Sequence, residues 1–209
     1  MPSEIQLAHE LNISQGTVRK AITDLVQNNI LVRQQGKGTF VASHDTHRDL
    51  FHFFHIEDTH GNKVLPDSRT LSCRRGQATR YECDRLQLTS RSPVIRIERI
   101  RLFNGVAAIL EEIVLPADLF DSLDRAHANR LPNALYQEFE DRFGITIQTA
   151  EERLTAVNAD DRTADLLGMD GGTALLKIER VAKTLDNMAV ELRTSLCDSR
   201  AHCYHNTFY

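Results

Sequence analysis

The sequence predicts an α+β protein of two domains, and three observations carry this prediction. Two short amphipathic segments stand at the front, and a glycine-flanked turn follows them at residues 36–38. Beyond residue 50 the chain is dominated by β-prone runs, and the hairpin dipeptides Asn104-Gly105 and Asp186-Asn187 separate consecutive runs. Tight hairpins make successive strands antiparallel, which favours an α+β domain. A length of 209 residues allows two modest domains, each with its own core.

The first 25 residues predict two helices joined by a tight turn. Ser3 is a good N-cap for the first helix, whose apolar residues recur at helical spacing up to Leu11. Asn12 and Ile13 form the connection, and Ser14 caps the second helix. The apolar residues of the second helix are Val18, Ala21, Ile22 and Leu25. Such a pair is typical of a helix-turn-helix, in which the start of the second helix enters a major groove of DNA.

The side chains at the start of the second helix suit DNA recognition. Gln15 can pair with an adenine edge, and Ser14 and Thr17 can reach bases or phosphates. Arg19 and Lys20 supply positive charge for the phosphate backbone. The alternative is a helical hairpin in which this basic pair is merely solvated.

A β-hairpin follows at the distance that a winged helix requires, and it favours the DNA-binding interpretation. Residues 30–41 form two β-prone runs around Gly36-Lys37-Gly38. Lys37 at the tip can approach phosphates or the minor groove, because its glycine neighbours carry no bulk.

These three segments resemble the winged-helix domain of GntR-type bacterial transcriptional regulators. The motifs are Pro-Ser-Glu at 2–4, Ile-Ser-Gln-Gly-Thr-Val-Arg-Lys-Ala at 13–21 and Arg-Gln-Gln-Gly-Lys-Gly-Thr-Phe-Val at 33–41. Gln15 stands where many relatives carry arginine, so an operator sequence cannot be transferred. Motif and resemblance together select these DNA-binding candidates: Ser3, Ser14, Gln15, Gly16, Thr17, Arg19, Lys20, Arg33, Gln35, Gly36 and Lys37.

The resemblance implies a further helix before Pro-Ser-Glu, whereas this chain starts at Met1-Pro2. We therefore expect a winged helix at residues 1–43 that is truncated at its N-terminus, a linker at 44–50, and a second domain at 51–209. Truncation would leave part of an apolar core uncovered. The affected residues would be Leu7, Leu11, Val18, Ile22 and Leu25.

Charge, cysteines and the linker place limits on function. The formal charge of −4 divides into +1 for residues 1–43 and −5 for the rest, which fits a protein that touches DNA with one module. The linker is histidine-rich, but without cysteines or carboxylates at ligand spacing we expect solvated side chains rather than a metal site. The four cysteines lack CxxC spacing and fit a reducing cytoplasm, and we find no membrane span or signal sequence.

The second domain is expected to consist of strands with three intervening helices. Strands are predicted at 51–56, 66–74, 94–103, 106–115, 145–157, 174–184 and 188–197. Helices are predicted at about 79–86, 133–143 and 160–167, with Asp160 capping the last and Gly168 ending it.

Several motifs of this domain resemble the UTRA effector domain of HutC-type GntR regulators, whose fold is similar to chorismate lyase. They are Arg-Ile-Glu-Arg-Ile-Arg-Leu-Phe-Asn-Gly at 96–105, Leu-Glu-Glu-Ile-Val-Leu-Pro at 110–116, Ala-Leu-Tyr at 134–136, Leu-Leu-Lys-Ile-Glu-Arg at 175–180 and Ala-Val-Glu-Leu at 189–192. The resemblance implies a homodimeric transcription factor, usually a repressor of a palindromic operator, that senses a small metabolite and needs no cofactor.

The effector pocket is expected around Arg99 and Arg101, which alternate on one strand and so share a face. Two guanidinium groups could hold a phosphate or carboxylate, so we expect an anionic effector. A strict two-residue loop at Asn104-Gly105 would put Glu112 on this face, whereas a three-residue loop with a bulge would place Glu111 opposite Arg99. The family pattern favours Glu111.

The resemblance supplies further pocket residues, namely Tyr136, Glu191 and Tyr204. Tyr136 begins a helix, where an anion is favoured, but Ala134 replaces a family serine and leaves a carboxylate effector as open as a sugar phosphate. The structural alternative is cross-strand ion pairing without a ligand. A binding module with an inactive winged helix, or a lyase-like enzyme, are the functional alternatives, although the sequence lacks a nucleophile elbow, a glycine-rich phosphate loop and a His-Glu metal motif.

Overall fold

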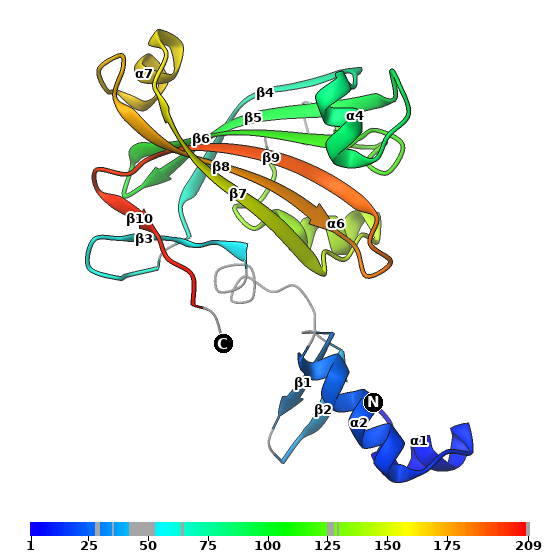
Figure 1. The fold of residues 1–209 in the computed structure, drawn as a ribbon. Coiled ribbons are helices and arrows are strands. Elements are labelled where there is room, and N and C mark those ends of the chain that lie inside the picture. Colours follow the sequence, from blue (N-terminus) through cyan, green and yellow to red (C-terminus); the bar gives the residue numbers. More distant parts are fainter. Residues whose placement is uncertain are drawn as a thin grey trace. The chain divides into compact units, whose positions relative to one another are not determined.

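The structure of the protein is a computed structural model, and the residues described from it are 1–27, 30–34, 36–41, 53–63, 65–124, 128 and 130–207. The chain divides into two compact units, residues 1–43 and 44–209 (Figure 1). The predicted linker at 44–50 lies outside the described residues.

The described residues of the first unit form two helices and a hairpin. Its elements are α1 Glu4–Leu11, α2 Gln15–Gln27, β1 Leu31–Gln34 and β2 Gly38–Val41. Ser3 caps α1 in a capping box, because its hydroxyl accepts from the Gln6 backbone while the Gln6 side chain accepts from the Ser3 backbone. Asn12 ends α1 in the left-handed conformation with φ 52°, which allows the tight turn into α2.

A small apolar core holds the first unit together. Val18, Ile22 and Leu31 are buried, and four partly buried residues pack against them: Leu7, Ala8, Leu25 and Val26. The expectation that Val18 and Ile22 would lack cover is therefore wrong, since α1 and β1 supply it. Leu11, by contrast, is 61% exposed.

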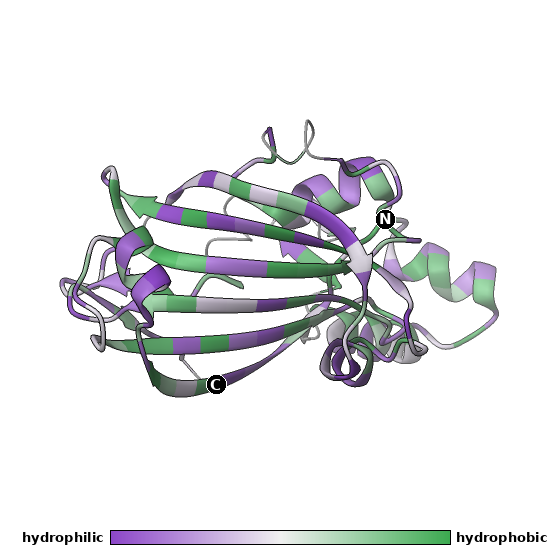
Figure 2. Cartoon of the chain, turned by 90° about the horizontal axis from the view of Figure 1, so that it is seen from above, coloured by the Kyte–Doolittle hydropathy of each residue, from purple (hydrophilic) through white to green (hydrophobic). Residues whose placement is uncertain are grey.

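The second unit is built on a six-stranded antiparallel sheet in the order β4-β5-β6-β9-β8-β7. Its strands are β4 Asp67–Gln77, β5 Pro93–Phe103, β6 Val106–Pro116, β7 Thr149–Asn158, β8 Ala174–Lys183 and β9 Ala189–Asp198. A separate pair joins β3 Ile56–Asp58 to β10 His202–Tyr204. Hydrophilic and hydrophobic residues alternate along several strands, as expected for a sheet with two differently used faces (Figure 2).

Among the described residues, helices cover both faces of the sheet. Helix α6 Leu135–Phe143 packs with residues such as Ile97 and Ile113 on one face. Helices α4 Arg80–Leu86 and α7 Asp161–Leu167 pack on the opposite face (Figure 1). Among the described residues, none of the helices is long and apolar enough to cross a membrane.

The α+β class is confirmed, but several predicted boundaries are wrong. The strand predicted at 51–56 begins only at Ile56, so residues 53–55 are not part of it. Residues 51–52 lie outside the described residues. The strand predicted from 145 begins at Thr149, because Ile145 and Ile147 are buried in the core rather than paired in the sheet. Strand β10, which has only three residues, was not predicted from the sequence.

The β5–β6 hairpin decides which glutamate faces the arginines. Phe103 pairs with Val106 across the two-residue turn, and the register then shifts between Arg101 and Leu102. This bulge places Glu111 opposite Arg99. The turn therefore has two residues, the shorter of the two predicted loops. The strand register is nevertheless the one predicted for a three-residue loop, because the extra residue lies in the strand and not in the loop.

Candidate effector pocket and DNA-binding surface

The start of α2 is open to solvent, as a recognition helix requires. Six DNA-binding candidates there are exposed: Ser14, Gln15, Gly16, Thr17, Arg19 and Lys20. The Ser14 hydroxyl accepts a hydrogen bond from the Thr17 backbone at 3.1 Å and lies 2.8 Å from the Thr17 hydroxyl. Since these hydroxyls serve the helix cap, Gln15 has the greater freedom to reach a base edge.

Two basic candidates meet a carboxylate of α1. Glu4 lies 3.0 Å from Arg19 Nε and 3.6 Å from Arg33 Nη2. The arginine side chains are 62% and 46% exposed, so these ion pairs contribute little and can exchange for a phosphate. Lys37 is exposed between Gly36 and Gly38, which have φ of 75° and 115°. Gln35 lies outside the described residues.

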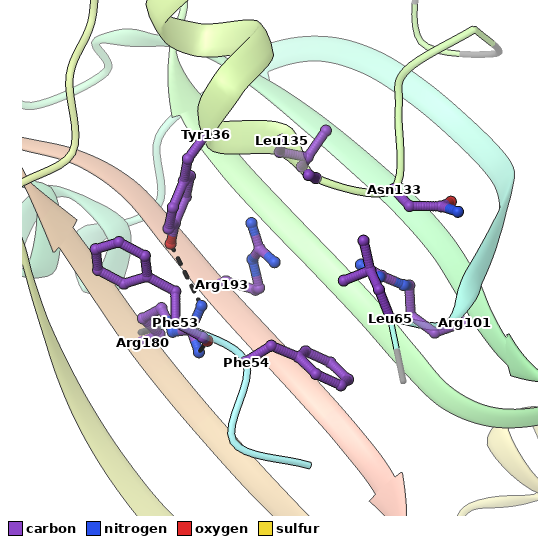
Figure 3. Close-up of a pocket in the computed structure, with 10 residues that line it drawn as sticks. Phe53, Phe54, Leu65, Arg101, Asn133, Leu135, Tyr136, Arg180 and Arg193 are labelled. Carbon is purple, nitrogen blue, oxygen red and sulfur yellow. Dashed lines mark hydrogen bonds between the residues drawn. The ribbon is translucent and has the colours of Figure 1, made fainter. Parts of the chain in front are cut away.

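A cavity with about 300 Å³ of empty space lies between α6 and the sheet. Its lining residues are Phe53, Phe54, Leu65, Arg101, Asn133, Ala134, Leu135, Tyr136, Arg180 and Arg193 (Figure 3). A second cavity of about 380 Å³ shares Phe54, Arg180 and Arg193 with the first and is also lined by Glu111, Glu152 and Tyr204. Three guanidinium groups thus border the first cavity.

Arg99 and Arg101 are both 1% exposed, but their positions differ. Arg101 lines the first cavity, whereas Arg99 lines neither of these two cavities and donates from Nε to Glu111 Oε2 at 2.5 Å. Within the described part of the chain, Nη1 and Nη2 of Arg99 and Nε of Arg101 are buried without a hydrogen-bond partner. Buried donors of this kind are costly unless a ligand or water satisfies them.

Glu111 stands at the centre of the basic cluster. Its carboxylate lies 2.5 Å from Arg99, 3.6 Å from Arg101 and 3.7 Å from Arg193. Burial alone would raise the pKa of Glu111, but Arg99, Arg101 and Arg193 hold it well below its usual range. Burial and the neighbouring Arg99 lower the pKa of Arg101 to about 9. The single negative charge of Glu111 therefore does not neutralise the three guanidinium groups around it.

Tyr136, Glu191 and Arg193 form a second hydrogen-bonded group. The Tyr136 hydroxyl donates to Glu191 Oε1 at 3.0 Å, and Arg193 donates to both Glu191 oxygens at 3.1 and 2.6 Å. The Arg193 guanidinium also lies over the Tyr136 ring, 5.6 Å from its centroid. Burial and Glu191 raise the pKa of Tyr136, so this tyrosine remains a neutral donor. Both predicted residues, Tyr136 and Glu191, thus belong to one group.

Arg180 joins this group to the second cavity. It donates from Nε to Glu152 Oε1 at 2.7 Å and from Nη1 to the Tyr136 hydroxyl at 3.4 Å. The hydroxyl of Tyr204 donates to the other oxygen of Glu152. Tyr204, which lines the second cavity, is thus linked to Arg180 through the Glu152 carboxylate.

Arg180, Arg193 and Glu152 were missed by sequence reasoning. Arg193 follows Glu191 by two residues, and strand alternation could have placed it on the same face. Prediction of Arg180 as a site residue would have required the β8–β9 register, which places it opposite Arg193. Four guanidinium groups, Arg99, Arg101, Arg180 and Arg193, meet three carboxylates, Glu111, Glu152 and Glu191, which leaves the cluster with one positive charge. Among described residues we find no cluster of His, Cys, Asp or Glu that could hold a metal.

Known proteins share both units. Residues 1–41 match the model of bacterial regulatory proteins of the gntR family, and residues 62–202 match the UTRA domain model. The transcriptional regulator YurK of Bacillus subtilis is 31% identical over 194 residues, which are 91% of this chain and 78% of YurK. The transcriptional repressor NagR of Bacillus subtilis is 28% identical over 192 residues, again 91% of this chain and 78% of the relative.

Among solved structures, the ligand-binding domain of a GntR-family transcriptional regulator from Bordetella bronchiseptica is similar to the second unit. It superposes with a TM-score of 0.71 at 28% identity, covering 76% of this chain and 99% of that domain.

The chain belongs to the GntR family of bacterial regulatory proteins, and its winged helix followed by a UTRA domain is the HutC-type arrangement. The curated relatives are transcriptional regulators, some named as repressors, and the protein is accordingly a regulator and not an enzyme.

Proposed function

We propose that this protein is a cytoplasmic, homodimeric repressor whose binding to a palindromic operator is controlled by a small anionic metabolite in the second unit. The observation that carries the proposal is the basic cluster beside the cavity. It holds one net positive charge and three buried guanidinium nitrogens that no described residue satisfies. An anion in the cavity would balance this charge and offer acceptors to Arg101, which lines the cavity.

Six residues form the proposed effector site: Arg99, Arg101, Glu111, Tyr136, Glu191 and Tyr204. The cavity beside them suits a small anionic ligand, because its lining combines aromatic and aliphatic side chains with three guanidinium groups. Ala134 and Leu135 at the start of α6 line it, and the backbone N–H groups of a helix N-terminus favour an anion. Because Ala134 offers no hydroxyl, a carboxylate suits this end of the cavity as well as the phosphate of a sugar phosphate.

The proposed DNA-binding residues are the candidates of α1, α2 and the β1–β2 hairpin named above, from Ser3 to Lys37. Residues 1–43 would form the DNA-binding domain and 51–209 the effector and dimerisation domain, joined by a linker at 44–50. Two winged helices of a dimer must be a fixed distance apart to bind two half-sites. A ligand that binds better to one arrangement of the dimer shifts its DNA affinity accordingly.

Thermal-shift screening tests the effector proposal. The full chain is heated with phosphorylated sugars, small carboxylic acids and their uncharged analogues. We expect stabilisation by an anionic compound and none by its uncharged analogue, because the analogue cannot balance the cluster charge. Stabilisation by uncharged compounds alone would contradict the proposal. The hits are then added to a gel shift with DNA upstream of the gene, where no shift under any condition would leave only a small-molecule binding module.

A further inference from the structure

Arg180 differs from the other arginines of the cluster because it touches the start of the described second unit. Its Nη2 donates to the backbone carbonyl of Phe53. Its Nε and Nη2 also lie 2.7 and 2.6 Å from Glu152 Oε1, so the guanidinium is held on the side that faces Phe53. Arg193, the cross-strand partner of Arg180, lines the same cavities, and its hydrogen bonds go to Glu191.

Phe53 is well placed to transmit a change at the cavity along the chain. It is the first described residue after residues 42–52, which connect it to β2 of the winged helix. The residue is 8% exposed, and its ring meets the Tyr136 ring edge-on, with centroids 4.9 Å apart. Its carbonyl is fixed by Arg180. Side chain and backbone of Phe53 are thus both attached to residues that line the cavity (Figure 3).

The opposite side of the guanidinium is held less firmly. Nη1 reaches the Tyr136 hydroxyl at 3.4 Å, which is long for a hydrogen bond from a charged donor. A ligand anion in the cavity could therefore gain a short contact with Nη1 without displacing Phe53 from Nη2. Burial opposes the charge of Arg180, but Tyr136 and Glu152 outweigh it and raise the pKa, so the group remains cationic.

We propose that Arg180 couples effector binding to the segment that leads to the winged helix. An anion in the cavity contacts the Nη1 side of Arg180 and restricts its guanidinium, whose Nη2 side then holds the Phe53 carbonyl more firmly. Arg180 is in this sense a positioning residue. The inference rests on the proposed function, since it requires an anion in this cavity.

Hydrogen–deuterium exchange of the full chain tests the coupling, with the peptide covering residues 53–58 as the readout. The probes are inorganic phosphate and glucose 6-phosphate, and calorimetry measures their binding. Arg180→Met removes the guanidinium that holds Phe53. Arg193→Met is the matched control, because it removes a guanidinium from the same cavities and the opposite register position without losing the Phe53 contact. Where a Met variant lacks a cooperative melting transition, the corresponding Lys variant replaces it.

Without ligand, Arg180→Met should exchange in residues 53–58 about tenfold or more faster than the unaltered protein, because a charge-assisted hydrogen bond to the backbone is lost. Arg193→Met should accelerate this exchange much less than Arg180→Met, because it keeps the hydrogen bond from Arg180 to the Phe53 carbonyl. A bound probe should slow the exchange several-fold in the unaltered protein and in Arg193→Met at saturation, but not in Arg180→Met.

Two results would overturn this inference and leave the proposed function intact. They are equal exchange rates in Arg180→Met and the unaltered protein, or probe binding that leaves the exchange of residues 53–58 unchanged. Equal acceleration in both Met variants would also overturn it, since general loosening would then explain the effect. Failure of both probes to bind the unaltered protein, together with failure of every anion in the thermal screen, would instead remove the proposed function on which the coupling depends.

Discussion

Glu111→Gln provides a sensitive test of the basic cluster. The substitution keeps the shape of the side chain but removes the negative charge that lies within 2.5 to 3.7 Å of three guanidinium groups. Glu111 is 3% exposed, so solvent cannot take over its role. Removal of one partner from a buried ion pair costs about 3–5 kcal/mol, because the remaining charge is left uncompensated. In a domain of this size, about 1 kcal/mol corresponds to roughly 2–4 °C in Tm, so we expect a decrease of roughly 6–20 °C.

Glu112→Gln is the matched control for this prediction. Glu112 is the next residue of the same strand, but it is exposed and points to the other face of the sheet. Its substitution should change stability by about 0.5 kcal/mol or less. Melting curves by circular dichroism compare the two variants with the unaltered protein. Equal Tm values for both variants would refute the central position of Glu111 and the register that creates it.

Three further predictions concern acid stability and DNA. Glu111 and Glu152 have pKa values lowered below 4.5 in the folded protein, so the stability that they contribute is present above that pH and is lost as the pH falls toward the folded pKa. Denaturant titrations from about pH 6 down to pH 3 should therefore show a falling free energy of unfolding. The free energy should fall less steeply with pH in Glu111→Gln. Lys37→Ala should weaken DNA binding on all sequences and reduce the salt slope by about 1, measured by fluorescence anisotropy at several salt concentrations; an unchanged slope would remove Lys37 from the phosphate contacts. Gln15→Ala should reduce the preference for operator over mismatched DNA by about 1–3 kcal/mol at adenine positions, and a uniform loss on both DNAs would contradict base recognition.

Local patterns predicted much of this fold, but long-range pairing decided the site. Strand alternation was enough to place Arg99 and Arg101 on one face, and capping residues such as Ser3 and Asp160 marked where helices begin. The choice between Glu111 and Glu112 was open, because the Asn104-Gly105 dipeptide is compatible with either arrangement: the extra residue can lie in the turn or in the strand. Only the bulge beyond Asn104-Gly105 decides it.

The role of Arg180 could not be predicted from local sequence. Its position depends on strand β8 lying between β7 and β9, so that Glu152 stands opposite it on one side and Arg193 on the other. The contact with Phe53 joins residues 127 positions apart. Strand order and contacts at this separation leave no periodic signal, whereas the alternation of Glu191 and Arg193 did offer one.

The most direct test of the central claim is fluorescence anisotropy of the upstream DNA fragment during titration with the anionic hits of the thermal screen. The unaltered protein should change its DNA affinity by about tenfold or more with one such anion, a coupling of about 1.4 kcal/mol. The uncharged analogue should have no effect, and Arg99→Ala should lose the response relative to its own ligand-free affinity. A response that an uncharged compound produces, or that persists in Arg99→Ala, would contradict control by an anion at the arginine cluster.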